Sequence, residues 1–207
     1  GERSSKLFIV AVINDETVHW SVPRLTGDLP PALTHHSLLR YDKHLVLFGG
    51  FDGKEANSDV WTMDTETNKW TKRSPQGQAA TPPSPALTQS GSIAPSSNIT
   101  PSSSSSALTA RSIAPRFGHC ALIVSNKMLV LGGNDHYGNY FNDALAYDLD
   151  TGVWSNLVNK TTVPRMAFHS AVRVGRHILV YGGRRKSSGL VKELWKVIWD
   201  EASGEIL

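Results

Sequence analysis

Short apolar runs separated by polar turn residues recur along the chain, and three of these runs end in a pair of glycines. The runs LVLF, LVL and LVY precede Gly49–Gly50, Gly132–Gly133 and Gly182–Gly183. Runs this short, rich in Leu and Val and bounded by turn residues, are typical of buried β-strands. A histidine lies thirteen residues before the first glycine of each pair, at His36, His119 and His169. Three copies in the same phase indicate an internal repeat.

Each copy predicts four short strands. In the first copy they are HSLLRY at 36–41, HLVLF at 44–48, DVWTMD at 59–64 and KWTK at 69–72. The last strand carries a tryptophan in the first two copies, and the third copy has an isoleucine in that place; these residues are Trp70, Trp154 and Ile206. An Asp-rich turn separates the last two strands.

A four-stranded antiparallel sheet cannot cover both of its own faces, so units of about 50 residues pack radially against one another. The predicted fold class is all-β, a β-propeller fragment of about three and a half four-stranded antiparallel blades. We expect the glycines to adopt positive φ and to allow close backbone approach, and the tryptophans to fill the space between blades. So few blades leave strand edges and apolar faces uncovered, which predicts further propeller blades on the same or another chain.

The spacing of the repeats also predicts the domain boundaries. The interval from His119 to His169 is 50 residues, but that from His36 to His119 is 83. Pro75–Ala114 accounts for the surplus, with eleven serines, six prolines and no aromatic residue. Such a segment buries too little apolar area to offset its ordering entropy, so we predict a disordered insertion at 75–114. The other predicted parts, all of one propeller domain, are two strands of a blade at 1–22, blades at 23–74 and 115–163, and an incomplete blade at 164–207.

These features resemble kelch repeats over nearly the whole chain apart from the insertion. The resemblance rests on the di-glycine after an apolar strand, the spaced Trp, and the segments PRFGHC at 115–120 and PRMAFHS at 164–170. It is closest to the longer-repeat kelch proteins of trafficking and cell polarity. It implies a non-catalytic protein–protein interaction scaffold or adaptor that needs no cofactor.

Composition and charge change this picture little. The net charge of +3 over 207 residues gives no strong reason to expect nucleic acid as a partner. A single cysteine, Cys120, leaves no internal disulfide and favours the cytoplasm, or the nucleus, as the compartment. The apolar run LFIVAVI at 7–13 follows Arg3 and Lys6, but it is too short to span a bilayer, and acidic residues follow it. We therefore expect a strand there, with neither a signal peptide nor a membrane partner.

The sequence contains no enzyme motif. The histidines are the strongest candidates for a metal-binding group. Four of them begin the innermost predicted strands: His35, His36, His119 and His169. They could bind a metal around a central channel, but positions fixed by a repeat favour a structural role, in which each imidazole bonds a neighbouring backbone group. A metal-dependent kelch enzyme remains an alternative. So does the regulatory or substrate-recruiting propeller of a larger enzyme, such as a ubiquitin ligase, phosphatase or transferase.

The resemblance places a binding surface at one end of the blades. In kelch propellers, the loops between the second and third strands share this end with the connections between blades. Here they contribute Phe51, Asp52, Arg116, Asn134, Asp135, His136, Tyr137, Arg165, Arg184 and Arg185. Arginine and aromatic residues favour interfaces, and arginine captures carboxylates and phosphates, so acidic or phosphorylated peptide segments are the predicted partners.

Two of these assignments have structural alternatives. Arg116 and Arg165 belong to a repeated Pro-Arg element, so each could instead pair with backbone or an aspartate inside its blade. Arg184 and Arg185 break the repeat and could be ordinary solvated loop charges.

The predicted insertion also carries modification candidates. Four residues precede proline and are phosphorylation candidates: Ser74, Thr81, Ser84 and Thr100. Phosphates there would place negative charge beside the arginines, which suggests a loop that folds back and blocks the binding face. The alternative is a tolerated linker.

Overall fold

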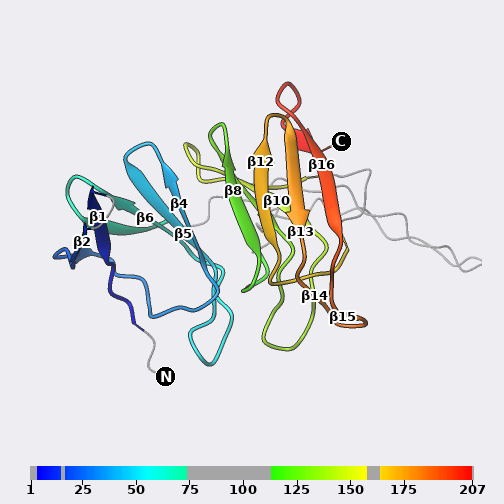
Figure 1. The fold of residues 1–207 in the computed structure, drawn as a ribbon, viewed down its shortest axis with the longest axis horizontal. Coiled ribbons are helices and arrows are strands. Elements are labelled where there is room, and N and C mark those ends of the chain that lie inside the picture. The colour runs from blue at the N-terminus through cyan, green and yellow to red at the C-terminus, as the bar shows by residue number, and fades with distance from the viewer. Residues whose placement is uncertain (1–3, 15–16, 74–112, 158–163, 207) are drawn as a thin grey trace, which may run out of the picture.

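The computed structural model describes residues 4–14, 17–73, 113–157 and 164–206 (Figure 1). These ranges contain strands and turns and no helix. Three main sheets, one from each copy of the repeat, stand side by side, and the short antiparallel pair β14 (Arg184–Arg185) and β15 (Gly189–Leu190) extends one end of the third sheet. The all-β propeller-type fold is confirmed. None of the described segments is a helix long and apolar enough to cross a membrane.

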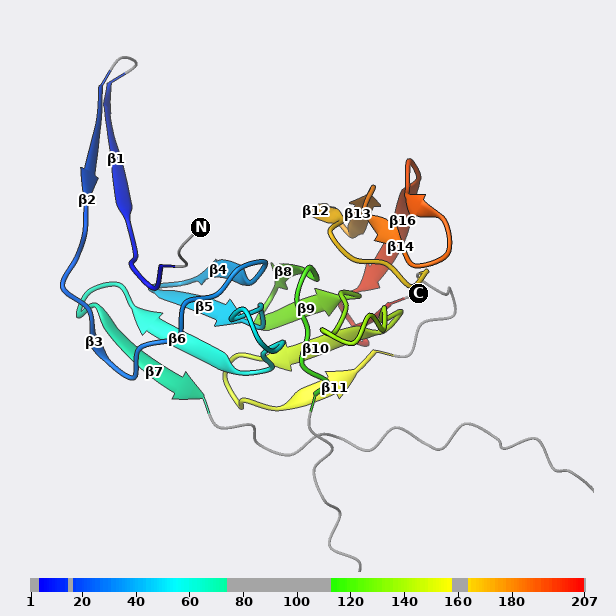
Figure 2. The same cartoon turned by 90° about the horizontal axis from the view of Figure 1, so that it is seen from below.

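The three main sheets share one strand order, which follows the chain from an inner to an outer strand. The first contains β4 (Ser37–Tyr41), β5 (His44–Phe48), β6 (Val60–Asp64) and β7 (Lys69–Arg73). The second contains β8 (Cys120–Val124), β9 (Lys127–Leu131), β10 (Ala144–Asp148) and β11 (Trp154–Asn156). The third contains β12 (Ser170–Val174), β13 (His177–Tyr181), β16 (Leu194–Asp200) and β17 (Glu205–Ile206). Inner strands β4 and β12 both contact β8, so the sheets fan out from a common side (Figure 2).

The strand register confirms the predicted repeat in detail. Met63 pairs with Trp70, Tyr147 with Trp154, and Trp199 with Ile206. Ile206 therefore takes the tryptophan position of the third copy, as its spacing predicts.

Three two-residue strands were not predicted: β14 and β15, which begin and end a predicted loop of the third copy, and β3 (Thr26–Gly27) at the edge of the first sheet. β3 joins the outer edge of this sheet parallel to β7. A Cβ at Gly27 would lie 2.1 Å from the Trp70 carbonyl oxygen, so only glycine permits this approach. Two residues are too few to leave an apolar pattern, which is why the sequence does not reveal this strand.

Apolar layers between the sheets form the core. Between the first and second sheets, the ring centroids of Phe48 and Trp154 are 5.0 Å apart, which confirms that this tryptophan fills the space between blades. Ile113 lies within the predicted insertion at 75–114, but it is buried in the same layer, so the C-terminal end of the predicted disordered segment is wrong at this residue. The layer between the second and third sheets includes Leu129, Val180 and Trp199.

Two apolar surfaces have no cover among the described residues. One is the hairpin of β1 (Ile9–Asn14) and β2 (Thr17–Ser21), which projects away from the sheets, with Trp20 63% exposed (Figure 2). The other is the face of the third sheet that points away from the second sheet, where Val172, Tyr181 and Leu194 are all more than half exposed.

The glycine pairs join neighbouring blades, which explains the fixed spacing between histidine and glycine. A Cβ at Gly49 would lie 2.8 Å from the ring of His119 in the next blade, and one at Gly50 would lie 2.9 Å from the Cβ of His36 in its own blade. The first glycine of a pair thus makes room for the histidine of the next blade, and the second for the histidine of its own. All six glycines have positive φ, as predicted.

A comparison between the first glycines of two pairs separates this packing role from the effect of backbone conformation. Gly132→Ala places a Cβ 2.6 Å from the Met166 carbonyl oxygen at φ +57°, whereas Gly182→Ala meets nothing closer than 3.8 Å at φ +73°. We expect Gly182→Ala to cost about 1 kcal/mol of unfolding free energy from backbone strain alone, and Gly132→Ala about 3 kcal/mol. Urea unfolding of both variants measures the difference. Equal losses would show that conformation alone fixes these glycines.

Candidate functional site

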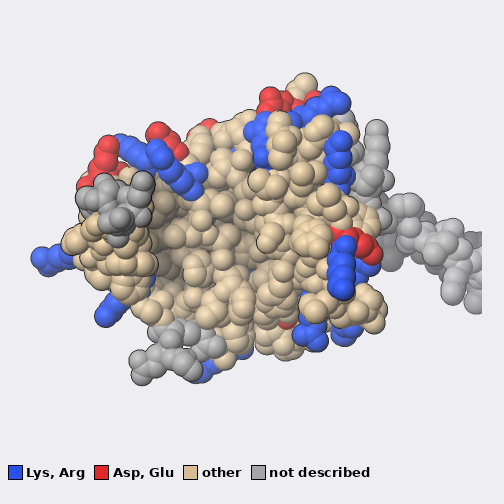
Figure 3. Space-filling model, in the orientation of Figure 1, with Lys and Arg blue, Asp and Glu red and all other residues tan. Residues whose placement is uncertain are grey.

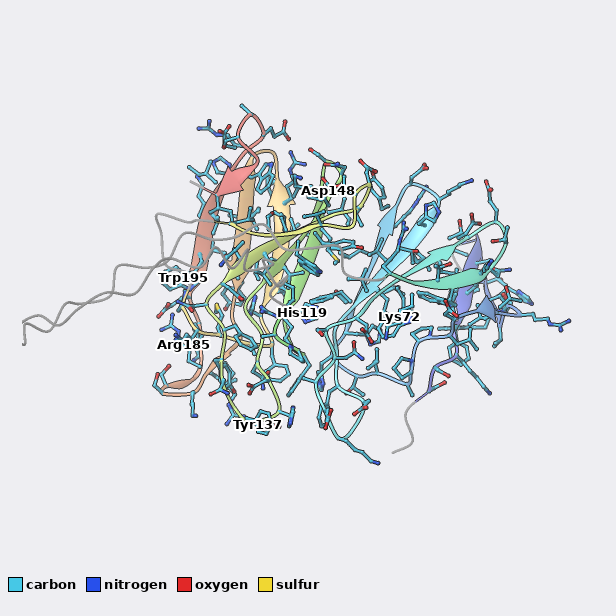
Figure 4. All side chains as sticks on the ribbon, turned by 180° about the vertical axis from the view of Figure 1, so that it is seen from behind. Lys72, His119, Tyr137, Asp148, Arg185 and Trp195 are labelled. Atoms are coloured by element: carbon cyan, nitrogen blue, oxygen red, sulfur yellow. The ribbon has the colours of Figure 1, made fainter. Side chains whose placement is uncertain are left out.

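The loops between second and third strands and the connections between blades lie together at one end of the sheets, as predicted. Three isolated β-bridges join them: Thr34 with Phe51, Phe117 with Asn134, and Ala167 with Arg184. Arg185 and Tyr137 mark this end, which we call the loop face, and Asp148 marks the opposite end (Figure 4). The bridges also show which residues of the three blades are structurally equivalent.

This equivalence separates the two arginines of the Pro-Arg element. The Arg116 carbonyl accepts a hydrogen bond from the Gly50 amide, and the Met166 carbonyl accepts the same bond from Gly133, at 2.9 Å in both cases. Met166, not Arg165, is therefore the counterpart of Arg116. The cause is one extra residue: Arg116 precedes His119 by three positions, and Arg165 precedes His169 by four.

Arg116 is only 1% exposed, so its side chain does not form part of the binding surface. Its guanidinium makes two hydrogen bonds to the Asp143 carboxylate, of 2.7 and 2.8 Å, and a third, of 2.9 Å, to the Gly132 carbonyl oxygen. It also lies 4.4 Å from the centre of the Phe141 ring. Its predicted role in partner contact is corrected accordingly, because every direction of the guanidinium is engaged inside the blade.

Arg165 lies on the surface instead. It donates one hydrogen bond, 3.0 Å long, to the Tyr140 carbonyl oxygen. Together with Arg185 and Lys186 it lines a pocket of about 520 Å³ between two neighbouring blades. The complete lining is Gly138, Asn139, Tyr140, Pro164, Arg165, Arg185, Lys186 and Ser187, with three cations and no carboxylate. Lys186 was not among the predicted site residues, although it directly follows Arg185.

Arg184 and Arg185 differ from each other. Arg184 is exposed on β14, and its backbone pairs with Ala167. The guanidinium of Arg185 donates to the Glu193 carboxylate at 2.7 Å and lies 5.6 Å from the centre of the Trp195 ring. The position of Arg185 is therefore fixed, while its side chain still reaches the pocket.

The loop from 134 to 140 is held by its own polar groups. Asp135 accepts hydrogen bonds from the amides of Tyr137 and Asn139 and from the Asn139 side chain. Partial burial opposes ionisation of Asp135, but these bonds outweigh it and lower the pKa of the carboxyl group. Asn134 is buried, which makes it and Asp135 supports of the loop rather than exposed contacts.

The tip of this loop is open to a partner. Tyr137 is 78% exposed and its ring lies against His136, with centroids 3.8 Å apart. The His136 Nδ1 accepts a 3.4 Å hydrogen bond from the Ala56 amide, which links the tip to the loop of the neighbouring blade. In that loop Asp52 accepts bonds from the amides of Lys54 and Glu55.

Sequence analysis missed an aromatic group on the loop face. It consists of His35, Phe51, Phe117 and Phe168, and we call it the aromatic cluster. The ring centroids of Phe51 and Phe117 are 5.1 Å apart, and those of His35 and Phe168 are 5.2 Å apart. Three of these residues stand next to the Pro-Arg or histidine positions, but nothing local in the sequence reveals that the three blade connections converge.

The repeated histidines pack between blades, and in His119 a side chain takes the place of the predicted backbone partner. The Nε2 of His119 is 3.1 Å from the Ser37 hydroxyl of the preceding blade, so its partner is a side chain and not a backbone group. Burial lowers the pKa of His119 to about 3, aided by Arg116, and burial lowers that of His169 to about 4. Cys120 is half-buried, and burial raises the pKa of its thiol.

Metal binding and phosphorylation are the two other candidate chemistries. The described residues contain no group of three or more His, Cys, Asp or Glu side chains placed to hold a metal ion. The phosphorylation candidates Ser74, Thr81, Ser84 and Thr100 lie outside the described residues.

Comparison with known proteins identifies the family. The sequence model described as the KLHDC2/KLHL20/DRC7 kelch-repeats domain matches residues 1–99 and 97–201. The chain belongs to the kelch-repeat family. Kelch repeats typically form protein-interaction domains.

Three relatives have different names and similar levels of identity. A probable serine/threonine-protein kinase of Dictyostelium discoideum is 25% identical over 99% of this chain and 16% of its own length. Acyl-CoA-binding domain-containing protein 4 of Arabidopsis thaliana is 25% identical over 87% of this chain and 22% of its own length. Host cell factor 1 of Rattus norvegicus is 26% identical over 81% of this chain and 8% of its own length. The chain thus spans less than a quarter of each relative.

Proposed function

We propose that this kelch domain is a non-catalytic interaction module that binds acidic or phosphorylated peptide segments through its loop face. The pocket formed by Arg165, Arg185 and Lys186 carries the proposal, because three cations converge there and no carboxylate lines it. Arginine binds carboxylates and phosphates with paired hydrogen bonds, which suits this role. A broad uncharged surface covers the inner strands, and the charged side chains lie around its margin (Figure 3).

The test is a quantitative pull-down from cell lysate with the Arg165→Glu/Lys186→Glu variant. Both residues are exposed, so the fold should persist while an acidic partner is repelled, and we expect its recovery to fall at least about tenfold. Arg185 is left intact because it pairs with Glu193.

The matched control is Lys69→Glu/Arg176→Glu, which makes the same change in charge at exposed positions at the other end of the sheets. Loss of the same partners in both variants would indicate non-specific attraction between charges. Recovery unchanged in both would refute the loop face as the binding site.

We propose further that the predicted insertion regulates binding at the loop face. Phosphates at Ser74, Thr81, Ser84 and Thr100 would compete with a partner for the same cations. Phosphomimetic substitution of all four should then weaken binding to the loop face, and unchanged affinity would refute this form of regulation. The single cysteine supports the cytoplasm, or the nucleus, as the compartment.

A further kelch blade is the second proposed partner, on the same or another chain. The exposed face of the third sheet supports it, because Val172, Leu179 and Tyr181 correspond to Leu122, Leu129 and Leu131, which are buried in the layer between the second and third sheets. A Cβ at Gly182 would meet no histidine among the described residues, whereas those at Gly49 and Gly132 meet a histidine of the next blade, and this difference supports it as well.

A second candidate function is that of a regulatory or substrate-recruiting propeller within a larger enzyme. The kinase relative favours it, since the chain matches only 16% of that protein. A change in the activity of an attached catalytic domain with the Arg165→Glu/Lys186→Glu variant would support this function.

A further inference from the structure

The aromatic cluster contains a backbone position that is strained in two of three blades. His35, Gly118 and Phe168 are equivalent residues, and their φ angles are +55°, +61° and +61°. Glycine adopts this conformation freely, whereas a bulky residue there is uncommon and strained. Gly118 therefore shows what the blade architecture requires, and His35 and Phe168 depart from it.

The strain places aromatic rings where the three blade connections meet. The Phe168 amide donates to the Gly118 carbonyl at 2.6 Å, and the Gly118 amide donates to the His35 carbonyl at 3.1 Å. A Cβ at Gly118 would lie 2.7 Å from the Phe168 ring, so this ring lies directly over the glycine. Phe117 contacts Phe51, His35 and Phe168, with centroids 5.1 to 6.1 Å apart.

The rings are not needed to fill the core. Phe168 is 44% exposed and His35 is also exposed, so much of the aromatic area faces solvent on the loop face. Strain of this kind persists at binding and catalytic sites, where the presented side chain has a use. Exposed aromatic side chains on an interaction face are typical binding anchors.

The neighbouring charge indicates what these rings bind. Arg165 lies three residues before Phe168 on the same connection, so their backbones are at most about 11 Å apart, the reach of three fully extended residues. Arg184 flanks that connection through its bridge to Ala167. Aromatic faces attract cations as well as apolar groups, but a cationic ligand would be repelled by these arginines.

We propose that Phe168 and His35 bind an aromatic side chain of a partner peptide whose acidic residue, two or three positions away, enters the Arg165 pocket. This inference rests on the proposed function of the loop face and adds the second half of the recognised motif. The partner is thus an extended segment with an acidic and an aromatic residue close together, and acidity alone is not sufficient.

The experiment is selection from a library of short random peptides displayed on phage, with the full chain as bait. We expect the enriched peptides to combine an aromatic residue with Asp or Glu two or three positions away. The bait variant Phe168→Gly should lose the aromatic preference and keep the acidic one. For the best enriched peptide, synthesised with a fluorescent label, this variant should weaken binding about tenfold or more.

Glycine is the matched substitution because it removes both the ring and the strain. Phe168→Gly should melt above Phe168→Ala, since alanine keeps the strained φ, and Phe168→Tyr should bind like the wild type. His35→Gly is a second ring-removing variant at the equivalent position and covers the case in which Phe168→Gly does not fold. Acidic peptides without an aromatic residue would overturn this inference and leave the proposed function standing. Peptides without acidic residues, unaffected by Arg165→Glu/Lys186→Glu, would overturn both.

Discussion

Acidification from pH 7.5 to about pH 5 is expected to lower the free energy of unfolding by about 4 kcal/mol, through two buried histidines. His119 and His169 are 8% and 7% exposed, and their pKa values in the folded protein are about 3 and about 4, against an ordinary value of 6.5. Below pH 6.5 the unfolded chain binds protons that the folded chain excludes. Stability is therefore complete above pH 6.5 and is lost as the pH falls toward the folded pKa values.

Each histidine contributes about 2 kcal/mol of this loss at pH 5, since one pKa unit corresponds to about 1.4 kcal/mol. The charged or titratable groups that act on His119 are Arg116, His36 and His169, and each of them disfavours its protonation. Asp148, whose pKa is about 2, affects stability only at lower pH, because its ordinary value is 3.8. Partial burial opposes its ionisation, and hydrogen bonds from Thr151 and Lys127 outweigh that effect.

Urea unfolding at several pH values measures this dependence. His119→Gln and His169→Gln should each reduce stability at pH 7.5 and should each remove about half of the loss between pH 7.5 and pH 5. A wild-type profile that is flat over this interval would contradict the burial of neutral imidazoles between the blades.

The repeat and the strand order could be predicted from sequence because each leaves a local periodic signal. The thirteen-residue spacing from His119 to Gly132 fixes the first two strands, and the seven-residue spacing from Tyr147 to Trp154 fixes the last two. Ile206 was assigned to the tryptophan position by spacing alone, and its pairing with Trp199 confirms this.

The candidate site was predicted less well, because burial and convergence are not local properties. The Pro-Arg dipeptide looks repeated, but the single extra residue before His169 leaves Arg165 on the surface and places Met166 where Arg116 is buried. The number of residues between each arginine and its histidine shows this shift, so the sequence alone could have distinguished Arg116 from Arg165. The aromatic cluster could not be found in this way, because His35 and Phe168 belong to different blades and meet only in the folded chain.

Arg116→Ala is expected to destabilise the fold by about 3–5 kcal/mol, the usual cost of breaking a buried ion pair on one side. The variant leaves the Gly132 carbonyl and the Asp143 carboxylate without the guanidinium that binds them at 2.7–2.9 Å. It also opens a cavity beside Phe141. Asp143 retains some contact with water, at 28% side-chain exposure, which places the expected loss in the lower half of the range. Urea unfolding at neutral pH measures it.

The third blade supplies the control, because Met166 occupies the place of Arg116 there without an ion pair. The double variant Arg116→Met/Asp143→Asn should recover most of the stability, since apolar packing often replaces a buried ion pair at little cost. Arg116→Met alone should remain destabilised, because Asp143 then loses its partner. A loss below about 1 kcal/mol in Arg116→Ala would contradict the structural role and return Arg116 to the partner-binding surface, where the resemblance to kelch propellers first placed it.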